Sequence, residues 1–336
     1  MSLGSFGSRR ATRLLVWLAV GPLALGLLAS CGGSTTIERY IPSRVLAFGD
    51  ENSVIEADGS KYTVNAVKTD LVTLDCAVHP LWVQVVAGHY GLVFPQCPGT
   101  VVAPVSRIYA VKDARVAGLA AQIALAGAMS ASDLATVFVG SNDIIDVYGQ
   151  FTGANQAALI ADVEARAINL ASQIRSIVDK GAKVAFTTLP DLGGSPFALA
   201  QDAAFPGTNR ASLLSTLTTK FNSKLRTSVS NGNSSSFIDG HQGAQVLGDE
   251  MILAIRKTVD TVPSIATYIN YTVAICDIPT LAATVHECTT QTLLAAATAA
   301  GGTATNYLWS DDRHLSAGGQ ASLGVLAVTR INANPL

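Results

Sequence analysis

The residues with the clearest potential for chemistry lie near the end of the chain, in Asp311-Asp312-Arg313-His314. An aspartate three residues before a histidine can fold back in a turn and hydrogen-bond one ring nitrogen. The other ring nitrogen is then basic and can take a proton from a nucleophile. We therefore predict that His314 is a general base and that Asp311 orients it, with Asp312 a solvated loop residue. The remaining histidines lack such a partner and are interpreted as structural or surface residues: His79, His89, His241 and His286.

A second candidate for chemistry is the amide of Asn142. The stretch Val137-Phe138-Val139 has the character of a buried strand and runs into Gly140-Ser141-Asn142-Asp143. A glycine lets the backbone approach a ligand, and an amide at a strand end can donate a hydrogen bond to an oxyanion. The alternative is an Asx turn that caps the following helix. We predict that Gly140 and Asn142 line a cleft and that Asn142 is an oxyanion donor.

A third candidate is the tight turn after the apolar run Val45–Phe48, with the sequence Gly49-Asp50-Glu51-Asn52-Ser53. Many α/β hydrolases hold their nucleophile on a turn that follows a buried strand in this way. The turn therefore places Glu51 at a position suited to chemistry, with Gly49 and Asp50 beside it.

Apolar runs that favour strands alternate along the chain with longer segments of helical periodicity. The strands are predicted at Arg44–Phe48, Arg107–Val111, Ala135–Val139, Lys183–Thr188 and Ser235–Ile238, and the helices at Val116–Met129, Asn155–Val178 and Arg210–Val229. Buried strands that alternate with helices favour a parallel sheet covered on both faces. Right-handed crossovers then place the carboxyl ends of the strands along one edge, where ligands bind in open α/β sheets. The predicted fold class is α/β.

Two regions do not follow this alternation. Asp58–Gln96 contains the turn signal Asp58-Gly59 and an amphipathic run at Leu81–Tyr90, and Gly243–Ala300 is rich in Ala, Thr and Ile with little punctuation. We interpret both as insertions that pack over the edge of the sheet and shape a pocket.

Together the three motifs resemble those of the GDSL (SGNH) hydrolase family. Phe48-Gly49-Asp50-Glu51-Asn52-Ser53 is similar to the opening motif Phe-Gly-Asp-Ser-x-Ser, Gly140–Asp143 to Gly-x-Asn-Asp, and Asp311–His314 to the terminal Asp-x-x-His. Leu189-Pro190-Asp191 is similar to another family strand end, and the resemblance extends from about Arg44 to Ile331. It implies a flavodoxin-like three-layer α/β/α sandwich with a mostly parallel sheet. It also implies ester hydrolysis, with Asn142 and the Gly49–Glu51 backbone as oxyanion donors.

The chain departs from this family at the nucleophile, because Glu51 stands where the catalytic serine is expected. A carboxylate beside His314 would form an ion pair, raise the histidine pKa and spoil it as a base. Glu51 could instead position a water, bind a cation, or attack an ester to give an anhydride. The alternative is a family member that has lost acyl-enzyme chemistry and keeps its cleft for binding.

Two other positions bear on this departure. Ser53 lies two residues after Glu51, which is about 200° around a helix, so we expect it to point away from the side that Glu51 faces. Lys112 and Asp113 stand where the family has Gly-Gly and where a backbone N–H normally completes the oxyanion hole. A residue other than glycine can donate its N–H there, but a positive φ would be costly.

The N-terminus has the pattern of a targeting segment. Arginines precede the apolar stretch Leu14–Leu28, about 15 residues long, whereas a membrane span needs about 20. It ends in Leu28-Ala29-Ser30-Cys31, which resembles a bacterial lipobox, the alternative being an ordinary secretory signal. We predict a signal peptide over residues 1–30, a tether over 31–42 and one hydrolase-like domain over 43–336. Lipid on Cys31 would anchor the protein, and Gly32 favours the outer membrane over the inner.

Four cysteines remain in the predicted mature domain. An even number in an exported protein favours disulfides over metal or redox chemistry. Of the three possible pairings we choose the two local ones, Cys76–Cys97 and Cys276–Cys288. A zinc site with nearby His79 and His286 is the rival, but no Cys-x-x-Cys pair occurs. We therefore expect no metal and no cofactor.

The overall composition limits the partners. The chain has 336 residues and a net charge of −2, which gives no support for nucleic-acid binding. We expect a monomer whose ligand is a small-molecule, lipid or glycan ester of the cell envelope. The leading hypothesis is ester hydrolysis by an esterase, lipase or deacylase, with Glu51 in the nucleophile position. The alternative is a catalytically inactive envelope lipoprotein that binds an acylated lipid or glycan.

Overall fold

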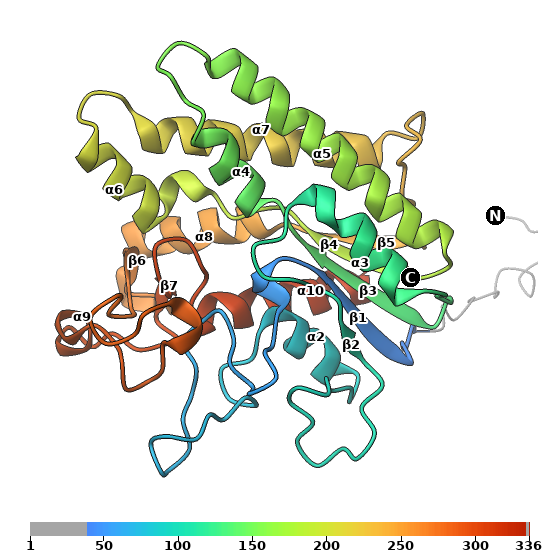
Figure 1. Ribbon diagram of the computed structural model, residues 1–336, viewed down its shortest axis with the longest axis horizontal. Coiled ribbons are helices and arrows are strands. Elements are labelled where there is room, and N and C mark those ends of the chain that lie inside the picture. Colours follow the sequence, from blue (N-terminus) through green and yellow to red (C-terminus); the bar gives the residue numbers. More distant parts are fainter. Residues whose placement is uncertain (1–38, 334–335) are drawn as a thin grey trace, which may run out of the picture. The chain divides into compact units, whose positions relative to one another are not determined.

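A five-stranded parallel sheet forms the centre of the computed structural model, which describes residues 39–333 and Leu336 (Figure 1). Its strands are β1 (Arg44–Gly49), β2 (Arg107–Ile108), β3 (Asp133–Phe138), β4 (Lys183–Thr187) and β5 (Gly243–Val246). They lie in the order β2-β1-β3-β4-β5 and every neighbouring pair is parallel. This is the flavodoxin-like strand order, in which the reversal beside β1 creates a ligand-binding crevice. The α/β sandwich expected from the sequence is confirmed.

Helices cover both faces of the sheet (Figure 1). One face carries α2 (Trp82–His89), α8 (Gly248–Thr261) and α10 (Ala317–Ala333), and the other carries α3 (Leu119–Ala126), α4 (Ser141–Tyr148), α5 (Gln156–Asp179), α6 (Pro196–Ala204) and α7 (Arg210–Ser230). The buried positions of α5 include Leu159, Val163, Leu170 and Ile174, which recur at helical spacing. This apolar stripe explains why the segment forms a helix and which face it turns inward.

The sheet brings two of the predicted motifs together. Strand β1 is buried from Val45 onward and β3 is buried along its whole length, as expected for strands covered on both faces. Gly49 at the end of β1 pairs with Phe138 at the end of β3. The turns that carry Glu51 and Asn142 therefore leave the sheet side by side.

Some predicted boundaries were wrong. Residues Ser235–Ile238 form a turn followed by irregular backbone, and the fifth strand is Gly243–Val246, which was predicted to belong to an insertion. This strand has low β propensity, and Gly243 is needed because a Cβ there would lie 2.8 Å from side-chain atoms of Ile238 and Val184. Strand β2 ends at Ile108 because Tyr109 and Ala110 both donate to the same carbonyl of Ala47, which breaks the regular ladder. The helix predicted to end at Met129 ends at Ala126, since Gly127 adopts a positive φ.

The two insertions meet beside the sheet edge. The first contains α2, and the second contains β5, α8, the short strand β6 (Asn270–Ala274) and the helix α9 (Ala295–Ala299). Strand β6 pairs in parallel with β7 (Tyr307–Trp309), which follows the second insertion, and the remaining backbone is mostly irregular. Both predicted disulfides, Cys76–Cys97 and Cys276–Cys288, are formed. No cluster of three or more His, Cys, Asp or Glu side chains suited to a metal occurs among residues 39–333.

The described chain from Arg39 onward forms one compact unit. Within it, no helix is long and apolar enough to cross a membrane. The predicted signal peptide, most of the tether and Cys31 lie outside the described residues.

Candidate active site

The end of β1 presents Glu51 to a cleft. Gly49 has φ +120°, and a Cβ at this position would lie 1.8 Å from the carbonyl oxygen of Phe138. The chain then enters a 3₁₀ turn, Glu51–Ser53, capped by the Asp50 carboxylate, which accepts from the Asn52 N–H at 3.1 Å. Ser53 is fully buried on the far side of this turn, where its Oγ accepts from Trp82 Nε1 at 3.1 Å. Ser53 therefore points away from the cleft, as its spacing from Glu51 predicts.

The end of β3 presents Asn142 to the Glu51 carboxylate, behind the residues that line the cleft; the prediction that Gly140 and Asn142 line the cleft themselves was wrong. Gly140 has φ +131° and packs so tightly that a Cβ would lie 2.8 Å from Phe221. Helix α4 begins directly afterwards, and Asn142 Nδ2 donates to Glu51 Oε1 at 3.1 Å and to Oε2 at 3.0 Å. Asp143 turns the other way and accepts from the N–H of Val116 at 2.9 Å.

The terminal motif forms the predicted turn. Asp311 Oδ1 accepts from the backbone N–H of Arg313 at 3.0 Å and of His314 at 2.7 Å, which folds the segment back on itself. Asp311 Oδ2 lies 2.7 Å from His314 Nδ1. The opposite ring nitrogen, Nε2, lies 3.1 Å from Glu51 Oε1. His314 thus stands between two carboxylates, with 8% of its side chain exposed.

The backbone donors differ from those expected. Gly49 N–H donates to Gln122 Oε1 at 2.8 Å and Asp50 N–H donates to the carbonyl of Phe138 at 2.9 Å, so neither can bind an oxyanion. The prediction was wrong for Gly49 and Asp50 because both amides belong to the packing of the strand end, whereas the Glu51 N–H interacts with the carboxylate of its own side chain. Asp113 instead supplies an N–H, which lies 2.9 Å from Glu51 Oε2. It does so with φ +58°, a conformation that Asp adopts more readily than most residues.

Glu51 consequently receives hydrogen bonds from the predicted base, from the predicted amide donor and from one backbone N–H. Its two oxygens contact His314 Nε2, Asn142 Nδ2 and the Asp113 N–H, while only 4% of its side chain is exposed. A carboxylate has about four acceptor positions, and these contacts use them. The groups that would hold a carbonyl oxygen in a serine hydrolase therefore hold a side chain of the protein itself.

The electrostatics of the site fix its protonation. Burial alone would raise the pKa of Glu51, but the hydrogen bond and charge of His314 and the donor Asn142 lower it to about 2. Burial likewise opposes charge on Asp311, yet His314 lowers the pKa of Asp311 to about 2. For His314, burial acts to lower the pKa, but Asp311 and Glu51 raise it to about 10. At neutral pH His314 is therefore an imidazolium between two carboxylates.

A cleft of about 590 Å³ opens in front of this cluster. We call Glu51, Asn142, Asp311 and His314 the motif side. The facing surface comes from the two insertions, and we call it the insertion wall: Tyr62, Cys276, Ile278, Thr284, Val285 and His286. The rim includes Lys112, Asp113, Asp312 and Arg313.

His286 lies on the insertion wall and lines the cleft, a position that its interpretation as a structural or surface residue did not include. Its Nδ1 lies 2.7 Å from Thr284 Oγ1, and its ring centroid lies 5.5 Å from that of Tyr62. Two other histidines interpreted as structural or surface residues lie away from the cleft. His79 is hydrogen-bonded to the carbonyl of Val64, and His89 is hydrogen-bonded to Arg39. No signal in the sequence could have placed His286, because the stretch of the insertion around it forms no long helix or strand and carries no motif.

The family model described as GDSL-like Lipase/Acylhydrolase matches residues 109–324, which include Asn142, Asp311 and His314 but not Glu51. No curated protein matches the chain. An acetylxylan esterase from Geobacillus stearothermophilus shares 14% identity and a TM-score of 0.37, over 87% of this chain and 96% of that one.

Two tryptophan-to-isoleucine variants from that organism, one called an acetyl xylan esterase and the other an acetyl-xylooligosaccharide esterase, are similar to the same degree. They have 12% and 14% identity, TM-scores of 0.38 and 0.39, and cover 86% and 87% of this chain and 94% and 96% of theirs. The family match extends over more than half of the sequence. The chain therefore belongs to the GDSL-like lipase/acylhydrolase family.

Proposed function

We propose that the protein recognises ester-bearing lipid or carbohydrate of the bacterial cell envelope in this cleft, and that Glu51 has replaced acyl-enzyme chemistry. The observation that carries the proposal is the position of the Glu51 carboxylate, which accepts from His314, Asn142 and Asp113 at 2.9–3.1 Å. The protein keeps the cleft of an ester hydrolase and fills the place where the reacting carbonyl would lie.

Acyl transfer by a serine hydrolase needs a free base and free oxyanion donors. The histidine must take the proton of the nucleophile, and the donors must receive the charge that develops on the carbonyl oxygen. Here His314 already carries its proton, because Asp311 and Glu51 raise its pKa to about 10. An ester carbonyl would also have to displace a carboxylate, which is the stronger acceptor. Both requirements fail while Glu51 keeps its position.

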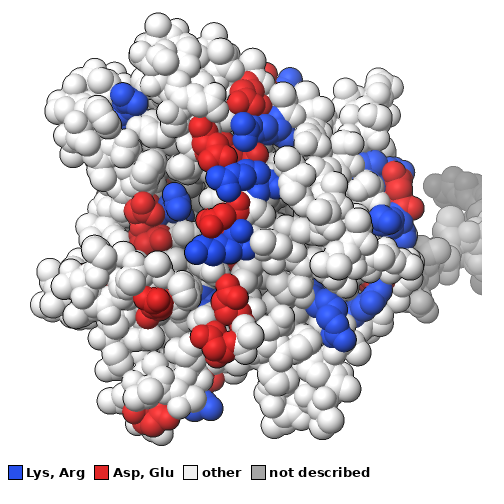
Figure 2. All heavy atoms as spheres, viewed as in Figure 1, with Lys and Arg blue, Asp and Glu red and all other residues white. Residues whose placement is uncertain are grey.

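The rest of the cleft suits an uncharged acylated ligand. Its walls combine apolar side chains, among them Pro196, Ala200 and Ile278, with polar groups, and its volume of about 590 Å³ is typical of small-molecule sites. Lys112 and Arg313 at the rim are matched in number by Asp113 and Asp312. Figure 2 shows the same balance on this face of the molecule, where basic and acidic clusters interleave in a central band. Such a surface favours neither a polyanion nor a polycation.

The proposed location rests on the sequence around Cys31. Lipid on this cysteine would tether the domain to a membrane through residues 31–42, and Gly32 favours the outer membrane. Incorporation of radiolabelled palmitate into the full chain tests this proposal. Wild-type protein should be labelled and sediment with membranes, whereas Cys31→Ala should be unlabelled. A label that persists in Cys31→Ala would contradict the lipid anchor.

The proposed loss of acyl-enzyme chemistry is tested by restoring the serine. Mature wild-type protein and Glu51→Ser are assayed on short p-nitrophenyl esters and labelled with a fluorophosphonate probe. Wild type should show neither turnover nor labelling. Glu51→Ser removes the carboxylate from the donors and frees His314 Nε2, so it should gain turnover by on the order of 100-fold or more.

Matched controls separate restored catalysis from a change in stability. Glu51→Ala empties the same space without supplying a nucleophile and should remain inactive and unlabelled. The gain in Glu51→Ser should disappear when His314→Ala is added. If wild type hydrolyses the esters as fast as Glu51→Ser, the proposed loss of turnover is wrong.

Ester hydrolysis by the wild-type protein is the second candidate. It is favoured by the intact Asp311–His314 pair and by the 3.1 Å contact between His314 Nε2 and Glu51 Oε1. In this reaction Glu51 would take a proton from a water whose oxygen attacks the carbonyl carbon, and His314 would give its proton to the leaving alcohol. Proton transfer from Glu51 to His314 would reset the site. Turnover by wild type without fluorophosphonate labelling, abolished by Glu51→Gln, would establish this candidate.

A further inference from the structure

We propose that Thr63 and Asn65 position the two sides of the cleft, Thr63 holding the motif side and Asn65 holding the insertion wall. Neither residue belongs to a family motif. Their roles are the same whether the cleft binds an ester or hydrolyses it, because both act on the placement of the walls.

Both residues lie in an unusual segment. Residues 61–65 have no regular secondary structure, yet each is at most 4% exposed. Irregular segments normally run over the surface, because buried backbone groups must find partners. Here the partners come from the segment itself: Asn65 Oδ1 accepts from the Lys61 N–H at 2.9 Å and Asn65 Nδ2 donates to the Lys61 carbonyl at 3.0 Å. Lys61 Nζ anchors the segment to three backbone carbonyls, those of Cys76, Val78 and His79.

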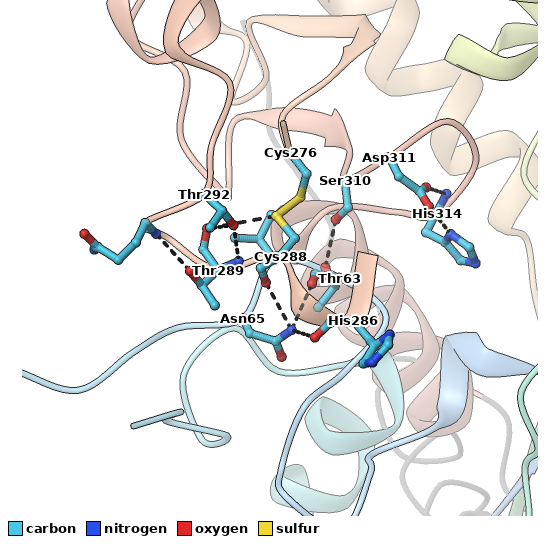
Figure 3. The surroundings of a disulfide bond; sticks show 12 residues. Thr63, Asn65, Cys276, His286, Cys288, Thr289, Thr292, Ser310, Asp311 and His314 are labelled. Carbon is cyan, nitrogen blue, oxygen red and sulfur yellow. Dashed lines mark hydrogen bonds and ion pairs between the residues drawn. A yellow bond between two sulfur atoms is a disulfide. The ribbon is translucent and has the colours of Figure 1, made fainter. Parts of the chain in front are cut away.

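Thr63 bonds both ends of the turn that carries the acid–base pair. Its Oγ1 donates to the carbonyl of Leu315 at 3.0 Å and lies 3.2 Å from Ser310 Oγ. Ser310 immediately precedes Asp311, and Leu315 immediately follows His314. Figure 3 shows Thr63 and Ser310 facing each other beside this turn. The hydroxyl of Thr63 therefore fixes the turn from a neighbouring segment.

Asn65 bonds the segment that carries His286. Its Nδ2 donates to the carbonyls of His286 at 3.0 Å and Cys288 at 3.1 Å, and its backbone N–H donates to the Cys288 carbonyl at 2.9 Å. The Thr290 N–H donates back to the Asn65 carbonyl at 2.9 Å. The disulfide from Cys288 to Cys276 attaches the same segment on its other side (Figure 3). Asn65 is thus the non-covalent half of a two-point attachment.

Tyr62 lies between Thr63 and the cleft and contacts the histidine on each side of it. Its ring centroid lies 6.3 Å from that of His314 and 5.5 Å from that of His286. Valine or leucine would fill the space of Thr63 or Asn65 equally well in a segment without solvent contact. Polar side chains at these positions are accounted for by the bridges they make, since buried polar groups are costly unless satisfied.

One NMR experiment on the mature protein, labelled with ¹⁵N-histidine, tests both roles. The signals of His314 and His286 are assigned with His314→Gln and His286→Gln. Thr63→Val keeps the shape and removes only the hydroxyl; it should shift the His314 Nδ1 proton upfield and increase the His314 ionisation constant by about tenfold. Thr63→Ser should restore the wild-type values. Asn65→Ala should shift the His286 ring signals and leave His314 unchanged.

The test is decided by which histidine each variant affects. If Thr63→Val and Asn65→Ala move both histidines alike, or if neither moves its own, the assigned roles are wrong. Asn65→Leu provides a second test if the alanine variant does not fold. In the Glu51→Ser background, Thr63→Val should lower kcat by on the order of 10- to 100-fold with KM unchanged. The NMR comparison stands even if Glu51→Ser shows no turnover, so this proposal and the proposed function can fail separately.

Discussion

The two sides of the cleft are built by different means. The motif side depends on the parallel sheet: β1 and β3 pair in register, so Glu51 and Asn142 lie side by side at their carboxyl ends. The insertion wall has almost no regular structure, and it is held by buried polar side chains such as Asn65 and by the Cys276–Cys288 disulfide. One side is fixed by repeating backbone hydrogen bonds and the other by single side chains.

This difference separates geometry fixed by the sheet from geometry fixed by individual side chains within one site. A sheet places the ends of its strands in the same way for many sequences, so a single residue such as Glu51 can change the groups at the cleft without moving the elements that carry them. A wall held by individual bonds can be reshaped by changing its attachments. Within the proposed function, we assign the choice of reaction to the motif side and the choice of ligand to the insertion wall.

The largest expected effect comes from removing the covalent attachment of the insertion wall. In the chain-entropy account, a disulfide that closes a loop with a sequence separation of 12 stabilises the folded state by about 3 kcal/mol. Cys276→Ala with Cys288→Ala should lower the free energy of unfolding by about this amount in urea titrations. Hydrogen exchange should then increase in the segment around His286, while the His314 Nδ1 proton is unchanged.

The second disulfide provides the matched control for this prediction. Cys76→Ala with Cys97→Ala removes a loop with a separation of 21 and should cost a similar free energy. Because neither cysteine bonds the segment that carries His286, exchange there should stay at the wild-type rate. Equal exchange in the two variants would mean that the wall is not held locally.

The same division explains what the sequence could predict. The strand periodicity and the three motifs were enough for the fold and for the convergence of Glu51, Asn142 and His314, because regular elements follow from local pattern. The positions of Tyr62 and His286 could not be predicted, since they depend on contacts between residues separated by more than 200 positions in the sequence, such as Asn65 with Cys288. Strand β5 was missed for a related reason: a weak β former is held in place by the tight packing around Gly243.

The direction of the Glu51 effect was predictable, but its geometry was not. A carboxylate beside His314 was expected to raise the histidine pKa, and the charges and hydrogen bonds of Asp311 and Glu51 do so although burial acts to lower it. The same carboxylate also accepts a hydrogen bond from the Asp113 N–H, and this contact requires Asp113 to adopt a positive φ. From the sequence, a positive φ at a residue other than glycine was expected to be energetically costly. Backbone strain of this kind is tolerated where surrounding contacts fix it.

An intermediate effect is expected from pH. Because the pKa of His314 is raised from 6.5 to about 10, its contribution to stability is complete below pH 6.5 and is lost as the pH rises through 10. The slope is at most about 1.4 kcal/mol per pH unit for one proton. Between pH 6.5 and 8 the wild-type protein should therefore lose up to about 2 kcal/mol more stability than His314→Gln, measured by urea unfolding at fixed ionic strength.

Two other buried groups, Lys61 and Asp50, also change the stability with pH and limit the range in which the His314 effect can be measured. Burial lowers the pKa of Lys61 to about 8, so above pH 8 the loss of its proton acts in the opposite direction to that of His314. Burial and the charge of Glu51 raise the pKa of Asp50 well above its usual range, which adds a decrease of the same sign as that of His314. Asp50→Asn should remove that second decrease. Parallel pH profiles for wild type and His314→Gln would show that the motif side lacks the buried ion pair.

The smallest effect should come from Ser53, the hydroxyl nearest to Glu51 in the sequence. Its Oγ accepts the indole N–H of Trp82 at 3.1 Å and is fully buried, so Ser53→Ala removes one hydrogen bond and should cost about 1 kcal/mol. In the Glu51→Ser background the same change should leave kcat and KM for p-nitrophenyl esters within about twofold, because the turn aims residue 51 at the cleft and residue 53 at Trp82. A loss of turnover in Ser53→Ala would mean that the turn can shift and that the register of the motif side is not fixed by β1. An unchanged rate with a small loss of stability would assign Ser53 to the packing behind the site and leave residue 51 as the position that decides the chemistry.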